Sequence, residues 1–126
     1  MSDVSKQQST VEDRQPESDE EFIARCELPL HSRAPEIAIV IRRAIATHGH
    51  LKIETVHALD RIPEDLGDIF IRESLNVVEF LMLLEEDLGV SIPDAPVSDL
   101  VSRETVTVKE IVETISALVV KRLNKW

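Results

Sequence analysis

Ser74 is the side chain whose position most clearly suggests chemistry. It begins the apolar stretch SLNVVEFLMLLEEDLG, which ends at Gly89. A serine at a helix start is most often an ordinary N-cap, whose oxygen accepts a backbone N–H. The same position also suits a hydroxyl that carries a phosphate group. Free N–H groups and the positive end of the helix dipole favour an exposed anion there by about 0.3–1 kcal/mol.

Ser74 lacks the sequence neighbours of a catalytic serine. No His or Lys lies near it, and the G-x-S-x-G pattern of a nucleophile elbow is absent. A serine nucleophile needs a base within hydrogen-bond reach. We therefore expect a handle for a group attached by another protein, or a plain helix cap, and not an enzyme.

The remaining metal-binding and redox residue types form no recognisable set. His48, His50 and His57 do not have the spacing of a tetrahedral metal site, and the acids around Asp65 do not follow the EF-hand order. Cys26 is the single cysteine, which excludes an internal disulfide and fits a reducing compartment. We expect no metal site and an inert free thiol.

The negative charge is concentrated in one part of the chain. The net charge is -10, and the segment from Glu54 to Glu104 holds 13 acids and three bases, so the rest is balanced. A field of one sign steers basic partners and raises their on-rates about 10- to 1,000-fold. The alternative is a solvated surface that keeps the protein soluble. Nucleic-acid binding is not expected, because the chain is acidic and has only three Phe, one Trp and no Tyr for stacking.

Targeting and membrane signals are not apparent. The first fifteen residues have no apolar stretch typical of a secretory signal, and residues 1–36 hold nine acids against four bases, the opposite of a transit peptide. The longest apolar runs, of which Phe80 to Leu84 is one, are far shorter than the roughly 20 residues of a membrane span. We expect a cytoplasmic monomer with no membrane span.

The apolar residues divide the chain into a tail and one domain. Of the 39 Leu, Ile and Val residues, only five lie in the first 33 positions. Residues 1–33 are therefore predicted to be a disordered polar tail. The other 34 Leu, Ile and Val residues supply one small core, which predicts a single domain over residues 34–123.

Helical spacing predicts the elements of this domain. A first helix follows Pro35 and stops at Gly49, a second runs from Ser74 to Gly89, and Thr107 with Glu110 forms a capping box that opens a third. A short helical turn is expected at residues 96–101. The fold class is all-α, a small bundle of three main helices and one short helix, with a long connection from about residue 48 to 73 that is functional or carries short structure of its own.

The helix that Ser74 begins is predicted to have two faces. Its apolar face turns inward with Leu75, Val78, Leu81 and Leu88, accompanied by Phe80 and Leu84. Its outward face is predicted to present three acids, Glu79, Glu85 and Glu86, with Val77 and Met82 between them.

The run LGDIFIRESLNVVEFLMLLEEDLGVSIPD, residues 66–94, resembles the acyl carrier protein family. The second helix of that family opens with Asp-Ser-Leu, continues apolar, reads Glu-Glu-acid and closes near Ile-Pro-Asp. The matching positions here are Glu73, Ser74, Leu75, Glu79, Glu85, Glu86, Asp87, Ile92, Pro93 and Asp94. A weaker likeness extends over residues 34–123.

The resemblance implies that a separate phosphopantetheinyl transferase esterifies Ser74 with 4'-phosphopantetheine. The terminal thiol of that group then carries an acyl group as a thioester. The resemblance also implies docking on basic patches of partners, which are the transferase and the acyl-handling enzymes of fatty acid, lipid or polyketide-like synthesis. The docking residues it implies are Glu73, Leu75, Val77, Glu79, Met82, Glu85 and Glu86.

Two features depart from the family pattern. Glu73 replaces the usual Asp, and about four extra residues stand between Gly67 and Ser74, in the segment 68–73. The apolar part of this insert is expected to pack on the core or to form a partner-specific surface. We therefore predict a specialised carrier and not the housekeeping carrier of fatty acid synthesis. The alternatives are an unmodified helical interaction module of the same fold and a peptidyl or aminoacyl carrier, although the acidic face after Ser74 favours acyl groups.

Overall fold

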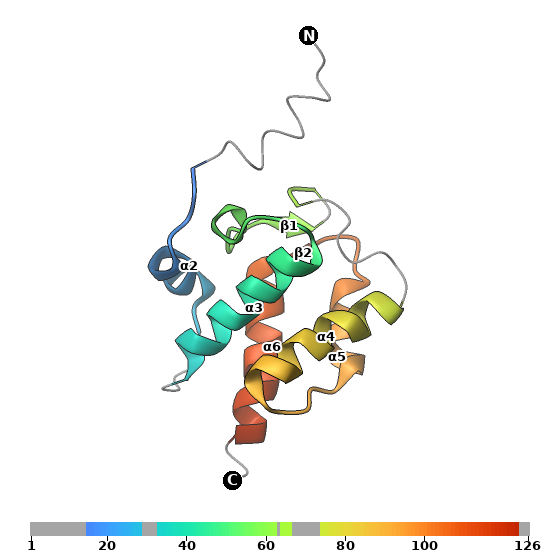
Figure 1. Cartoon of the computed structure of the whole chain (residues 1–126). Coiled ribbons are helices and arrows are strands. Elements are labelled where there is room, and N and C mark those ends of the chain that lie inside the picture. Colours follow the sequence, from blue (N-terminus) through green and yellow to red (C-terminus); the bar gives the residue numbers. More distant parts are fainter. Residues whose placement is uncertain (1–14, 29–32, 63, 67–73, 124–126) are drawn as a thin grey trace.

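The computed structural model describes residues 15–28, 33–62, 64–66 and 74–123, and the side chains of residues 74–76 and 123 lie outside the description. The described part is a small all-α bundle, as the sequence predicts, with a minor pair of two-residue strands (Figure 1). Its elements are α2 (Asp19–Cys26), α3 (Ala34–His48), the 3-10 turn η1 (Ile53–Thr55), β1 (Arg61–Ile62), α4 (Ser74–Leu88), α5 (Asp94–Val101), β2 (Val106–Thr107) and α6 (Val108–Leu123).

Helix α3 has the limits that its sequence predicts. Pro35 stands in its first turn, where the missing N–H of proline costs nothing. The helix ends at Gly49, whose N–H donates to the Ile45 carbonyl at 2.9 Å. Its buried face consists of Ala34, Ile37, Ala38, Val40, Ile41, Arg42, Ala44, Ile45 and Ala46, most of them aliphatic. This helix packs against α4 on one side and α6 on another.

The predicted capping box at the start of α6 is confirmed. The Thr107 hydroxyl accepts the Glu110 N–H at 3.1 Å, and the Glu110 carboxylate accepts the Thr107 N–H at 2.9 Å. The helix then buries an apolar stripe formed by Val108, Ile111, Val112, Ile115 and Val119. Lys121 and Arg122 stand in its last turn, at the negative end of the helix dipole.

The connection between α3 and α4 carries short structure of its own, as predicted. After η1 it forms β1, which pairs antiparallel with β2, Arg61 opposite Thr107 and Ile62 opposite Val106. Its carbonyls also accept the first N–H groups of α6, from Lys109 to Ala58 at 2.8 Å and from Val108 to Asp60 at 2.9 Å. The connection is thereby fixed to the N-terminus of α6. The predicted insert 68–73 and Gly67 lie outside the described residues.

The prediction of a disordered tail over residues 1–33 is wrong for residues 15–28. These residues include α2, which packs beside α3 and α6, away from α4 and α5 (Figure 1). Ser18 and Glu21 form a second capping box, and Phe22 and Cys26, one turn apart, are fully buried. Local capping and two buried side chains compensate for the low apolar content of the segment. Residues 1–14 and 29–32 lie outside the described part.

No helix among the described residues is long and apolar enough to cross a membrane.

Ser116 is a polar residue buried among the apolar side chains of the core. It is 0% exposed on α6, and its hydroxyl has no hydrogen-bond partner among the residues that the structure describes. A buried polar group without a partner costs about 1–3 kcal/mol. Ser116→Ala should therefore raise the free energy of unfolding by about 0.5–1 kcal/mol, since it removes the stranded hydroxyl and alanine is the better helix former. Urea unfolding followed by circular dichroism measures the change.

The control for this substitution is Ser102→Ala. The hydroxyl of Ser102 is exposed and donates to the Asp99 carbonyl at 2.9 Å. This exposed change should leave the free energy of unfolding within about 0.5 kcal/mol of the parent. A loss of stability in Ser116→Ala would mean that the hydroxyl makes a stabilising hydrogen bond, and would contradict the description of the core.

Candidate functional site

Ser74 is the first residue of α4, where the sequence predicts the helix to begin. Helix α4 continues to Leu88, and Gly89 follows it with φ 68°, a left-handed conformation that favours glycine. The Gly89 N–H donates to the Glu85 carbonyl at 2.8 Å and closes the last turn. Helix α4 therefore presents its N-terminal backbone N–H groups at Ser74. Glu73 and the side chains of Ser74 and Leu75 lie outside the described part.

One stripe of α4 faces the core. Phe80 and Leu84 are fully buried, and Leu81 and Leu88 nearly so, which confirms their predicted inward orientation. The prediction is wrong for the two valines. Val77 is 4% exposed and belongs to the core, whereas Val78 is 37% exposed. Spacings of four, seven and eleven residues place Val77 on the stripe with Leu81, Leu84 and Leu88.

The opposite side of α4 presents what we call the outer face, made of Val78, Glu79, Met82 and Glu86. Met82 is 59% exposed, and Glu79 and Glu86 are exposed as predicted. Val78 and Met82 are four residues apart and form an apolar patch beside the two acids. Beside this patch a pocket lies between α4 and the start of α5, lined by Val78, Leu81, Met82, Glu85, Ile92 and Asp94.

Glu85 has a structural role that the sequence did not reveal. Its Oε2 accepts the Ile92 N–H at 2.7 Å, and the residue is half-buried. The bond spans the turn at Gly89 and ties the end of α4 to the segment that enters α5. Glu85 therefore differs from Glu79 and Glu86, whose carboxylates are exposed. No spacing rule within a helix could predict a hydrogen bond that crosses the turn.

The histidines discussed as metal candidates are divided between two places. His48 and His50 line a pocket with Thr47, Glu79 and Leu83, between the end of α3 and α4. His57 lies on the connection, where its Nε2 is 2.9 Å from the Gln15 carbonyl oxygen. Within the described ranges, no group of three His, Cys, Asp or Glu side chains could hold a metal ion.

Cys26 lies on the buried side of α2. Burial is the main cause that raises the pKa of its thiol to about 12, and the negative charge of Glu17 adds to the effect. A thiol with this pKa contains very little of the reactive thiolate near neutral pH.

Glu85→Ala should lower the free energy of unfolding by about 1–2 kcal/mol, because the half-buried Ile92 N–H loses its acceptor. Glu85→Gln keeps an oxygen at the same position and should recover about half or more of that loss. Glu86→Ala, next to it on the exposed surface, is the control and should change stability by less than about 0.5 kcal/mol. Urea unfolding measures all three, and equal losses at positions 85 and 86 would contradict the assigned role.

Comparison with known proteins finds a relative by sequence. The chain is 34% identical over 68 residues to the acyl carrier protein of Rickettsia bellii (strain RML369-C), and the matched region covers 54% of this chain and 74% of the relative. No protein-family model matches the chain, and no solved structure matches it. The relative supports a non-catalytic carrier, the class that the sequence predicts. With this identity over about three quarters of the relative, the chain belongs to the acyl carrier protein family.

Proposed function

We propose that this protein carries acyl intermediates as thioesters on a 4'-phosphopantetheine arm attached to Ser74 and presents them to biosynthetic enzymes. The observation that carries the proposal is the position of Ser74 as the first residue of α4, in a chain of the acyl carrier protein family. The backbone of Ser74 is held in place by a regular helix of the bundle. A flexible group attached to its side chain would be anchored at one end and able to move at the other.

The start of α4 suits such a group. Attachment forms a phosphodiester at the Ser74 oxygen and breaks the diphosphate bond of coenzyme A, which releases adenosine 3',5'-bisphosphate and the hydroxyl proton. The N-terminal N–H groups of α4 and its dipole favour the phosphate negative charge at that end. When bound, the group supplies a thiol that holds the acyl chain as a thioester. This protein supplies the base and the docking surface.

The outer face of α4 is proposed as the main docking surface. Glu79 and Glu86 provide negative charge toward basic patches, and Met82 offers a flexible apolar contact that adapts to several partners. Val78 takes the place that the sequence assigned to Val77, which is buried. Glu73 and Leu75 remain in the proposed docking set on the sequence pattern.

The partners are proposed to be a phosphopantetheinyl transferase and acyl-handling enzymes. The exposed acids of α4 favour acyl over peptidyl or aminoacyl cargo. The insert 68–73 and Glu73 in place of Asp support a specialised member of the family. An unmodified interaction module is the alternative, and the following experiment separates the two.

Incubation with coenzyme A and a broad-specificity phosphopantetheinyl transferase should add the mass of one phosphopantetheine group to the protein, as measured by intact-mass spectrometry. Ser74→Ala should show no gain, because the substitution removes the attacking oxygen. Ser102→Ala, which removes an exposed serine elsewhere, should load like the parent. An unchanged mass in the parent, or a gain that persists in Ser74→Ala, would refute the carrier assignment.

Reversal of charge on the outer face should weaken recognition. Glu86→Lys and Glu79→Lys should each lower kcat/KM for loading of Ser74 by about tenfold at low salt, since a basic partner would then meet a like charge. Added salt should reduce the difference. Glu20→Lys makes the same charge change on exposed α2, away from α4, and serves as the matched control. Equal losses at all three positions would show a net-charge effect and not a docking surface.

A further inference from the structure

Arg42 joins two parts of the chain that are far apart in sequence. Its side chain leaves α3 and is 1% exposed. Nη1 donates to Asp19 Oδ1 at 2.8 Å, Nη2 donates to the Glu17 carbonyl at 2.6 Å, and Nε donates to the Val56 carbonyl at 3.0 Å. The guanidinium also lies 4.7 Å from the centre of the Phe22 ring. One side chain thus holds both the connection and residues 15–28, which we call the N-terminal segment.

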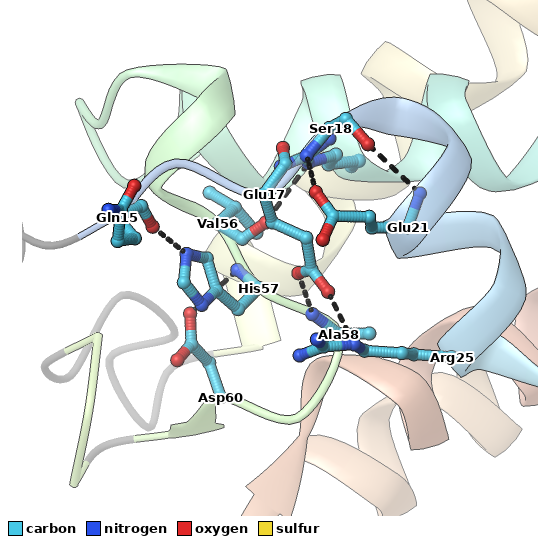
Figure 2. A network of polar contacts seen from close by, with 10 residues as sticks. Gln15, Glu17, Ser18, Glu21, Arg25, Val56, His57, Ala58 and Asp60 are labelled. Carbon is cyan, nitrogen blue, oxygen red and sulfur yellow. Dashed lines mark hydrogen bonds and ion pairs between the residues drawn. The ribbon is translucent and has the colours of Figure 1, made fainter.

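Glu17 makes the second link between these two parts (Figure 2). Its side chain is 2% exposed, and Oε2 accepts the Ala58 N–H at 2.9 Å. Its own N–H donates to the Glu54 carbonyl at 3.0 Å. Arg25 Nε lies 3.3 Å from the other carboxylate oxygen, an ion pair without hydrogen-bond geometry. The N-terminal segment therefore holds the connection through the backbone and the side chain of Glu17, which bind backbone groups of Glu54 and Ala58.

The peptide groups of Ala58 connect this segment to α6. The Ala58 N–H donates to Glu17, and the Ala58 carbonyl accepts the Lys109 N–H at 2.8 Å. At the other end of α2, Lys109 Nζ lies 3.1 Å from Glu27. The connection is thereby held between α6 on one side and the N-terminal segment on the other.

The N-terminal segment contributes few fully buried side chains to the core. Among the residues of α2 only Phe22 and Cys26 are fully buried, whereas α3 and α6 each bury a continuous apolar stripe. Ile23 and Leu28 are partly buried against the core, and the other attachments are hydrogen bonds and ion pairs, which water can replace. Parts with few buried apolar contacts open at lower free energy than the whole protein. The segment is expected to leave before the bundle unfolds.

We propose that the N-terminal segment is a detachable brace. It undocks as a unit while the bundle stays folded, and when docked it fixes the connection around residues 54–58. That connection leads through Leu66, which is 6% exposed, toward Ser74. A docked brace would therefore keep the described part of the connection, residues 54–62 and 64–66, in one arrangement when a partner binds at Ser74. This last step rests on the proposed function, whereas the undocking does not.

Cys26 provides a direct measure of undocking, because it is the single cysteine of the chain and is fully buried beneath α2. Alkylation of the full chain by iodoacetamide at pH 8 should proceed through segment opening, at a rate that changes little in low urea. Glu17→Gln should accelerate it about tenfold, since the buried charge-assisted bond to Ala58 is weakened. Glu20→Gln, an exposed acid of the same helix, should stay within about twofold of the parent.

A second variant and a second measurement guard against general unfolding. Asp19→Asn weakens one Arg42 contact at a side chain that is 56% exposed, so it should fold and still accelerate alkylation. Hydrogen exchange followed by NMR should show faster exchange at the Ala58 N–H in both variants, with the Leu84 N–H of α4 unchanged. Alkylation that occurs only through global unfolding, or equal acceleration at Ala58 and Leu84, would refute the brace.

The link to Ser74 is tested by the kinetics of loading. Asp19→Asn should raise the KM for phosphopantetheine transfer by about threefold with kcat little changed, because residues 54–62 and 64–66 of the connection would then be less ordered and would cost more to fix on binding. An unchanged KM in a variant with faster Cys26 alkylation would refute the link and leave the undocking intact. Alkylation and exchange use the unmodified protein and should be the same in Ser74→Ala. Failure of the carrier assignment is therefore distinguishable from failure of the brace.

Discussion

Helix α4 has to supply core packing and a free surface with the same fifteen residues, and the rest of the bundle is arranged around this constraint. Phe80 and Leu84 are fully buried, while Met82 between them is 59% exposed. The helix packs against both α3 and α5, which leaves its outer face open. Because the first residue of α4 is Ser74, the same packing that buries Phe80 also sets the direction of the site. The position of the candidate attachment residue is therefore a consequence of core packing.

The connection shows how a long segment with little regular secondary structure can be kept in place. Each helix begins with N–H groups that have no partner inside the helix. In α6 two of these N–H groups donate to the carbonyls of Ala58 and Asp60, so the connection supplies the acceptors that the helix itself lacks. The pairing of Ile62 with Val106 continues the same contact as a two-residue strand pair. The start of α6 thus adds hydrogen bonds to a connection that also packs its apolar residues Val56, Ala58, Ile62 and Leu66 into the core.

The sequence predicted the features that have local signatures. The helical limits at Gly49 and Gly89 and the capping box of Thr107 with Glu110 are encoded within one turn each. The Ser18–Glu21 capping box has the same signature, but the low apolar content of its surroundings led to the prediction of disorder. Val77 and Val78 are adjacent and chemically identical, so periodicity alone assigned them the wrong way round. The hydrogen bond from Ile92 to Glu85 crosses a turn, and the one from Arg42 to Glu17 joins residues 25 positions apart. No local sequence pattern predicts such contacts.

The polar character of the contact around Arg42 fits an N-terminal segment that undocks and docks again. A buried charge is rarely the most stabilising choice, because the loss of its hydration offsets much of what its partners contribute. An aliphatic residue at position 42 would hold Phe22 as well, but it would leave an apolar patch exposed whenever the segment departs. When the segment is undocked, water hydrates the guanidinium, so its exposure carries no such cost. When the segment returns, the carbonyls of Glu17 and Val56 and the carboxylate of Asp19 fix its register, since each must meet one donor of the planar group. Arginine at position 42 therefore gives a contact with a fixed register when the segment is docked and exposes no apolar patch when it is undocked.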